Sequence, residues 1–314
     1  MQNHFDVIVI GAGAAGLTAG IYLSRAKVDT LILNEGAIGG QMVLTHEIAN
    51  YPGVESISGY ELARIMKSQA QKFGCTIKSN LKITNMNLQN EIKEITVNNK
   101  DVYTSSAVII ATGGKSRTIG SPGEDQFKGK GISYCATCDG DFFQNKEIVV
   151  VGGGNSALEE AVSLTKYASK VTIIHQFDHF QAFEHYVDEA NNNPKISFIM
   201  ESKIIEFTGD EKLSKVKIQN LTTNEISEME IDGVFIFIGY VPNTEKLDGI
   251  IELNEWKEII VDKTLATSLK GVYAAGDSIA KRYRQVTTAV ADGTIAALSA
   301  AEYINSLKKE SVLA

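Results

Sequence analysis

Short uninterrupted apolar runs recur along the chain, and several of them stop at a cluster of glycines. The first run covers residues 5–10, a helical stretch continues to residue 26, and a second run covers residues 31–33. Between the first run and the helical stretch stand Gly11, Gly13 and Gly16. A continuous apolar run of this length is typical of a strand buried in a parallel sheet. The order therefore predicts a strand, a glycine turn, a helix and a parallel strand.

The same arrangement recurs 141 residues later. Residues 147–151 form an apolar run, a helical stretch continues to about residue 169, and residues 171–174 form another run. A shift of 141 residues aligns the three glycines with Gly152, Gly154 and Ala157. Two such units in one chain predict two dinucleotide-binding folds rather than one.

Two further apolar runs assign the C-terminal part of the chain to the first unit. Residues 108–111 and residues 271–275 each lead into a glycine turn, and residues 287–306 are alanine-rich and helical. We therefore expect an α/β fold of two Rossmann-like domains with three-layer ββα architecture. The expected domains are a discontinuous first domain, residues 1–115 and 245–314, and a central domain, residues 116–244.

Length, composition and charge exclude several classes of protein. The 314 residues fit two domains of roughly 150 residues each. The net charge of −8 lacks the basic excess of a nucleic-acid binder. Three cysteines are too few for a secreted disulfide scaffold, and the N-terminus lacks the cationic start of a signal peptide, so we expect a cytoplasmic protein. Residues 7–24 carry no charge, but their glycine pattern favours a strand and a helix over a membrane span.

The first unit has the features of a dinucleotide site. Its glycines allow the backbone to approach a pyrophosphate at the N-terminus of the following helix, which begins near Ala14 and Ala15. Glu35 stands just after the second strand, where a carboxylate binds ribose hydroxyls in such sites. The sequence therefore predicts that this unit binds a nucleotide cofactor.

The second unit lacks the side chains that a pyridine nucleotide needs. The 141-residue shift places Gln176 where Glu35 stands, so the position offers neither an acid for a ribose hydroxyl nor a base for a 2′-phosphate. No arginine occurs between residues 118 and 281. Residues 118–244 contain 10 lysines and 19 acidic residues, a net charge of −9. An acidic unit of this kind is a poor site for NADPH.

Cys135 and Cys138 are separated by two residues and precede the second glycine turn. Thiols at this spacing can close a disulfide, and a lowered thiol pKa makes one of them a nucleophilic thiolate. The alternative, a zinc site, requires four ligands, and the chain has no second pair at this spacing. The motif therefore favours a redox-active dithiol and no metal. Cys75 is expected to be a buried apolar residue.

These motifs together resemble the low-molecular-weight thioredoxin reductases over essentially the whole chain. Besides the two glycine turns and the Cys135–Cys138 motif with its Asp139, the resemblance is carried by Gly39-Gly40-Gln41, Asn50-Tyr51-Pro52-Gly53, Gly276-Asp277 and Arg284-Gln285. It implies an FAD-dependent enzyme that reduces thioredoxin and forms a homodimer.

The resemblance also assigns roles to individual residues. The expected catalytic residues are Cys138 facing the flavin, Cys135 attacking thioredoxin, and Asp139 as their acid–base group. Glu35 is expected to bind the ribose of FAD and Asp277 the ribityl chain. The complete set of expected FAD contacts is Gly11, Gly13, Ala14, Ala15, Gly16, Glu35, Gly40, Gln41, Asn50, Ala111, Thr112, Gly113, Gly276, Asp277, Arg284 and Gln285.

One segment departs from the family pattern. Family members that use NADPH carry His-Arg-Arg-x-x-x-Arg after the second strand of the central domain, whereas residues 175–181 here contain no arginine. This departure resembles the ferredoxin-dependent flavin thioredoxin reductases, in which reduced ferredoxin replaces the pyridine nucleotide. Residues 281–284 hold three cations and are either a solvated loop or a dock for such an acidic partner.

Two alternative functions remain open on the sequence. The first is a thioredoxin reductase that uses NADPH or NADH through an atypical site, which the surviving glycine turn at Gly152 and Gly154 leaves possible. The second, from another class, is a flavin-binding redox sensor whose dithiol only signals. Turnover with a pyridine nucleotide distinguishes the first, and failure to reduce any thioredoxin distinguishes the second.

Overall fold

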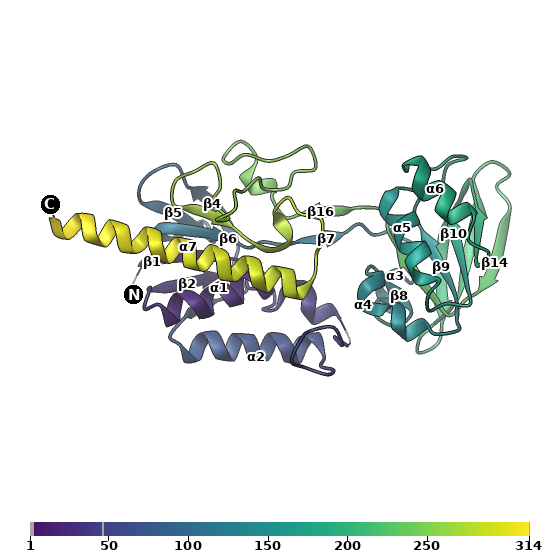
Figure 1. Cartoon of the computed structure of the whole chain (residues 1–314), viewed down its shortest axis with the longest axis horizontal. Coiled ribbons are helices and arrows are strands. Elements are labelled where there is room, and N and C mark those ends of the chain that lie inside the picture. The colour runs from purple at the N-terminus through teal and green to yellow at the C-terminus, as the bar shows by residue number, and fades with distance from the viewer. Residues whose placement is uncertain (1–2, 46, 314) are drawn as a thin grey trace. The chain divides into compact units, whose positions relative to one another are not determined.

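The computed structural model describes residues 3–45 and 47–313, which form two compact units (Figure 1). Unit 1 comprises Met1–Lys115 and Val241–Ala314, and unit 2 comprises Ser116–Tyr240. The chain leaves unit 1 once and returns to it once. At these two crossings the short strands β7 (Gly114–Ser116) and β16 (Tyr240–Pro242) pair with each other.

Unit 1 is built on a seven-stranded sheet in the order β3-β2-β1-β6-β5-β4, with β17 also paired to β6. Its strands are β1 (His4–Ile10), β2 (Thr30–Leu33), β3 (Thr76–Lys78), β4 (Ile83–Asn87), β5 (Lys93–Val97), β6 (Asp101–Ile110) and β17 (Val272–Ala274). The long strand β6 pairs antiparallel with β5 near its start and parallel with β1 and β17 near its end. The apolar runs predicted from the sequence form the centre of this sheet.

The α-helices of this unit are α1 (Ala14–Arg25), α2 (Gly59–Lys72) and α7 (Val286–Leu313). Helices α1 and α7 contact the sheet, and α2 packs against α1 and η1. Three short 3₁₀ helices complete the unit: η1 (Gly40–Leu44), η3 (Glu245–Leu247) and η4 (Gly276–Ser278). The alanine-rich helix α7 packs closely against α1. The two helices are so near that a Cβ at Gly293 would stand 2.2 Å from the Ala15 carbonyl oxygen. The close approach therefore depends on a residue without a side chain at position 293.

Unit 2 has three layers. A parallel sheet in the order β11-β10-β9-β15-β8 is its middle layer. Its strands are β8 (Ile132–Ser133), β9 (Glu147–Val151), β10 (Lys170–Ile174), β11 (Ile196–Ile199) and β15 (Gly233–Ile236). The second sheet is antiparallel: β12 (Ser202–Gly209), β13 (Leu213–Asn220) and β14 (Ile226–Glu230). The helices are α3 (Glu124–Phe127), α4 (Ala136–Asp139), η2 (Gly140–Phe143), α5 (Asn155–Leu164) and α6 (Glu184–Asn191).

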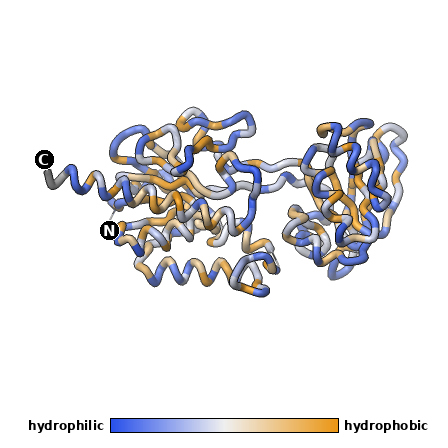
Figure 2. The backbone as a smooth tube through the Cα atoms, in the orientation of Figure 1, coloured by the Kyte–Doolittle hydropathy of each residue, from blue (hydrophilic) through white to orange (hydrophobic). Residues whose placement is uncertain are grey.

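Alternate residues of β9 contribute to two separate cores. Ile148 and Val150 pack with Leu158 of α5, whereas Val149 packs with Phe207 of the antiparallel sheet. In Figure 2 the hydrophobic segments lie mainly within the sheets and the hydrophilic segments in the outer loops. This arrangement confirms the predicted α/β fold with ββα layers.

The structure corrects the ends of two predicted helices. Helix α5 ends at Leu164 instead of near residue 169, and the Lys195 ammonium group donates to the carbonyl oxygens of Thr165 and Ala168 at 2.7 and 2.9 Å. Those carbonyls are thus satisfied by a residue distant in sequence. The closing helix α7 continues to Leu313, beyond the predicted end near residue 306. None of the helices among the described residues is long and apolar enough to span a membrane.

Candidate active site

Cys135 and Cys138 are joined by a disulfide, with their Cα atoms 5.3 Å apart. Cys135 is the N-cap residue of α4, and the backbone N–H of Cys138 donates to its Sγ atom at 3.2 Å. After reduction of the disulfide, the same N–H stabilises a thiolate on Cys135 more than a neutral thiol. The local backbone therefore favours Cys135 as the nucleophile of the pair.

Asp139, the predicted acid–base residue, lies one residue beyond the disulfide and is partly buried. Its Oδ2 atom accepts a hydrogen bond from the Ser133 hydroxyl at 2.6 Å. Burial raises the pKa of the Asp139 carboxyl, and the hydrogen bond from Ser133 opposes this rise. A carboxyl held in this way can serve as a proton donor closer to neutral pH than an exposed aspartate.

A buried carboxylate supports the segment that leads to the disulfide, and the sequence motifs did not point to it. Glu124 accepts hydrogen bonds from the Tyr134 hydroxyl at 2.6 Å and from the backbone N–H groups of Ile119 and Gly120 at 3.1 and 2.7 Å. Burial, followed by the contact with Glu124, raises the pKa of Tyr134. Tyr134 therefore remains protonated and ties the residue before Cys135 to the core of unit 2.

The glycine turn of unit 1 has the shape that a pyrophosphate requires. Gly11 has φ +106°, and a Cβ there would stand 2.2 Å from the Ala111 carbonyl oxygen. A Cβ on Gly16 would stand 1.9 Å from the Gly11 carbonyl oxygen, so α1 lies directly on the turn. Gly13, in contrast, faces open space, and Ala14 and Ala15 begin α1 next to it. The first N–H groups of a helix lack intrahelical partners and are suited to a phosphate.

Two more predicted FAD segments are brought to the same edge of the sheet. The Ala111 N–H donates to the Ile10 carbonyl oxygen at 2.7 Å, which places Ala111, Thr112 and Gly113 beside the turn. A Cβ on Gly276 would stand 2.9 Å from the Ala15 Cβ. The hydroxyl of Thr112 is buried and has no hydrogen-bond partner among the described residues. These features fit a dinucleotide, because the edge offers an open turn and an unused hydroxyl.

The segment around Gly40 also reaches the turn. The Gly39 N–H donates to the Ala12 carbonyl oxygen at 2.7 Å, and a Cβ on Gly40 would stand 3.2 Å from the Gly13 Cα. Gln41 follows in η1 and is exposed. Two other predicted FAD contacts bond to each other: the Asn50 side-chain amide donates to the Gln285 side-chain oxygen at 3.4 Å.

Glu35 is placed differently from the other predicted contacts. Its carboxylate accepts a hydrogen bond from the Ile83 N–H at 2.8 Å and forms an ion pair with Lys246. The side chain that touches the glycine turn is Asn34, whose Oδ1 accepts from the Ala12 N–H at 2.9 Å. Asn34 is the first residue after β2, and its position immediately after the strand is the signal that could have identified it.

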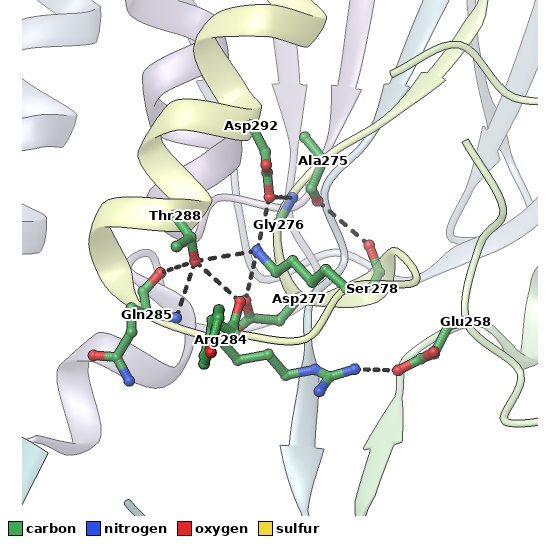
Figure 3. Close-up of polar contacts among 11 residues, drawn as sticks. Glu258, Ala275, Gly276, Asp277, Ser278, Arg284, Gln285, Thr288 and Asp292 are labelled. Atoms are coloured by element: carbon green, nitrogen blue, oxygen red, sulfur yellow. Dashed lines mark hydrogen bonds and ion pairs between the residues drawn. The ribbon is translucent and has the colours of Figure 1, made fainter. Parts of the chain in front are cut away.

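Two of the three cations in residues 281–284, the basic loop, are paired with acids of the same unit, and Figure 3 shows the pair of Arg284 and Glu258. Lys281 is mostly buried and pairs with Asp277 and Asp292 at 3.2 and 2.7 Å. Arg284 pairs with Glu258. Burial raises the pKa of the Asp277 carboxyl, and the charge of Lys281 opposes the rise. The loop therefore carries less uncompensated positive charge than its composition suggests.

The second glycine turn, in unit 2, is partly filled. Gly152 has φ +141°, a backbone conformation that favours glycine. The imidazole of His175 lies against Gly153, 2.3 Å from the place that a Cβ on Gly153 would take. The Gln181 N–H donates to the Gly153 carbonyl oxygen at 2.8 Å. Gln176 and Phe177 are exposed, and the exposed carboxylate of Asp178 follows them. The segment of residues 175–181, which the structure describes in full, contains no arginine or lysine.

Cys75 is remote from this chemistry. It is buried at 5% exposure in the core of unit 1, and its Sγ lies 3.9 Å from the Thr30 carbonyl oxygen. Burial raises the pKa of its thiol to about 12. Cys75 is therefore an unreactive thiol in the folded protein.

Comparison with known proteins gives consistent matches over nearly the whole chain. A model of the pyridine nucleotide-disulphide oxidoreductase family matches residues 5–293. The chain is 44% identical over 303 residues to the 34.2 kDa protein in the rubredoxin operon of Clostridium pasteurianum, covering 96% of this chain and 98% of that protein. It is 44% identical over 313 residues to the thioredoxin reductase of Peptoclostridium acidaminophilum, covering 98% and 99%. The crystal structure of thioredoxin reductase from Streptococcus pyogenes MGAS5005 matches with a TM-score of 0.94 and 39% identity, covering 98% of this chain and 100% of that one.

Proposed function

Because this chain belongs to the low-molecular-weight thioredoxin reductases of the pyridine nucleotide-disulphide oxidoreductase family, we propose that it reduces thioredoxin with electrons from reduced ferredoxin. The enzyme class is that of an FAD-dependent disulfide oxidoreductase. The observation that carries the choice of donor is the segment after β10, where Gln176, Phe177 and Gln181 stand in place of the arginines of NADPH-dependent relatives.

FAD is the cofactor of this family, and the residues of unit 1 fit it. We propose that the turn from Gly11 to Gly16 holds its pyrophosphate, with the Thr112 hydroxyl and the Asn34 amide beside it. When bound, FAD supplies electron transfer to the disulfide and accepts electrons one at a time or in pairs. Asp277 and Gln285 stay predicted contacts of the same site.

The dithiol residues perform the exchange with thioredoxin. The Cys135 thiolate attacks one sulfur of the thioredoxin disulfide, which forms a mixed disulfide and releases one thioredoxin thiolate. Cys138 passes its proton to Asp139 and attacks Cys135, which releases the second thioredoxin thiolate and closes the Cys135–Cys138 disulfide. Asp139 then returns the proton to the leaving thiolate.

Charge supports ferredoxin over a pyridine nucleotide. The segment in which NADPH-dependent relatives carry their arginines contains Asp178 here, whose pKa is lowered by the hydrogen bond from His179. The carboxylate therefore stays ionised and repels a phosphate at neutral pH. We place the ferredoxin contact at the basic loop of unit 1, where Arg282 and Tyr283 are the exposed members.

We also propose a homodimer formed by unit 1. Helices α1, α2 and α7, which pack in series, carry exposed apolar side chains: Tyr22, Tyr60, Ile65, Ile295 and Leu298. A contiguous exposed apolar patch marks an interaction surface, and the proposal requires that these side chains form one. Sedimentation equilibrium should give twice the chain mass of 34.1 kDa, and a monomer at micromolar concentration refutes the proposal.

Anaerobic flavin absorbance tests the donor. The purified holoenzyme is mixed in turn with NADPH, NADH and chemically reduced ferredoxin, each with thioredoxin present. We expect bleaching and turnover with ferredoxin alone, and in Cys135→Ser we expect bleaching without reduction of thioredoxin. Rapid turnover with NADPH or NADH refutes the ferredoxin proposal. Cycling of the disulfide without reduction of any thioredoxin supports the redox sensor instead.

A further inference from the structure

The hydroxyl of Ser133 connects Asp139 to the backbone of Cys135. Ser133 ends β8 and is buried at 5% exposure. Its Oγ atom donates to Asp139 Oδ2 at 2.6 Å and accepts from the Cys135 N–H at 3.1 Å. The Cys135 carbonyl oxygen lies 3.3 Å from the same Oγ atom. One hydroxyl therefore meets the acid–base carboxyl, a backbone donor and a backbone acceptor.

A hydroxyl has one hydrogen and two lone pairs, so it can satisfy this set in two ways. When Asp139 is ionised, the Ser133 hydrogen points to Oδ2, and the Cys135 N–H donates to a lone pair of Oγ. When Asp139 is protonated, its own O–H can donate to Oγ, and the Ser133 hydrogen can turn to the Cys135 carbonyl oxygen. Both protonation states are then hydrogen-bonded without movement of any heavy atom.

We propose that Ser133 is a positioning residue that allows the buried carboxyl of Asp139 to release and regain a proton during dithiol exchange. The inference deepens the proposed function and rests on it for the role of Asp139. A buried carboxyl without this partner favours its neutral form, because burial penalises the charge. Such a carboxyl accepts the proton of Cys138 readily and returns it slowly.

The surroundings make Ser133 the main polar influence on Asp139. Burial is the larger cause of the shift in the pKa of Asp139, and the hydrogen bond from Ser133 opposes it. Of the titratable residues nearest to Asp139 in the sequence, Cys135 and Cys138 carry no charge while they form the disulfide, and Asp141 lies two residues on in η2. The oxidised protein therefore isolates the effect of Ser133 from that of the thiols.

Carbon-13 NMR of aspartate carboxyls in the oxidised holoenzyme measures the pKa of Asp139 directly, with Asp139→Asn identifying the resonance. Ser133→Ala should raise this pKa by about one unit, since it removes a hydrogen bond to the charged form. Ser133→Thr keeps the hydroxyl, so the pKa of Asp139 in this variant should stay close to its wild-type value. Ser202→Ala is the matched control, because Ser202 is a buried serine of the same unit that donates to the Met200 carbonyl oxygen at 2.8 Å.

The corresponding limb of the pH profile of thioredoxin reduction should move in the same direction in Ser133→Ala. An unchanged pKa of Asp139 in Ser133→Ala, or an equal shift in Ser202→Ala, overturns the inference. Near-ultraviolet circular dichroism verifies that each variant is folded. The titration uses no electron donor, so an enzyme that fails to reduce thioredoxin while the pKa still shifts refutes the proposed function and not the coupling between Ser133 and Asp139.

Discussion

If the donor is ferredoxin as proposed, arginine at positions 176 and 181 should raise the affinity of unit 2 for NADPH. Gln176 and Gln181 are both exposed, so longer side chains meet no packed core there. The backbone of Gln181 is held at the second glycine turn by the hydrogen bond from its N–H to the Gly153 carbonyl oxygen. Gln176 follows β10, where an arginine accommodates the 2′-phosphate of NADP in this fold, and Gln181→Arg adds a second cation to the same segment.

The size of the effect follows from exposure. A hydrogen bond to a charged group is worth about 1.5–3 kcal/mol, whereas an exposed ion pair contributes only about 0.2–1 kcal/mol. Because both positions are exposed, the double variant should gain about 0.4–2 kcal/mol in binding free energy, or roughly 2- to 30-fold in Kd. Asp178 stays ionised between them and keeps the gain at the lower end of this range.

Calorimetric titration of the oxidised holoenzyme with NADPH and NADH measures the gain. NADH lacks the 2′-phosphate, so the affinity of Gln176→Arg/Gln181→Arg for NADH should rise much less than its affinity for NADPH. The matched control, Ile226→Arg/Ser227→Arg, adds the same charge to the same unit at exposed positions of β14. The reasoning is refuted if the wild-type protein already binds NADPH at micromolar Kd, or if the β14 variant gains as much as the turn variant.

Three further predictions concern the rest of the molecule. Gly16→Ala should lower the free energy of unfolding by about 2–4 kcal/mol in urea titration, because its Cβ would stand 1.9 Å from the Gly11 carbonyl oxygen, whereas Gly13→Ala, which faces open space, should change stability far less. Cys75 has a pKa of about 12 when folded and 9.0 as its ordinary value, so its contribution to stability should be constant below pH 9 and decline between pH 9 and pH 12. Urea titrations of wild type and Cys75→Ala across that range measure it, and parallel pH dependences contradict the expectation. Arg282→Glu should raise the KM for ferredoxin several-fold and leave the KM for thioredoxin unchanged, and equal effects on both would argue against docking at this loop.

The glycine turns and the disulfide motif could be predicted because each is encoded in a few consecutive residues. Gly11, Gly13 and Gly16 occur directly after an apolar run, and that order predicts a strand, a glycine turn and a helix. Cys135 and Cys138 are close enough in sequence to meet in a single helical turn. The fold class follows from the repetition of the first unit 141 residues later.

The contacts that adjust the site depend on residues distant in sequence, and only the tertiary structure decided them. Glu35 follows its strand as expected and stays a predicted ribose contact, but the bonding of its carboxylate to Ile83 and Lys246 and the contact of Asn34 with the turn come from the tertiary structure. Lys281 is basic in the sequence and largely neutralised in the fold, because Asp292 of α7 lies beside it. Side-chain direction and ion pairing depend on which distant segments pack together, and a local pattern of residues carries no record of those partners.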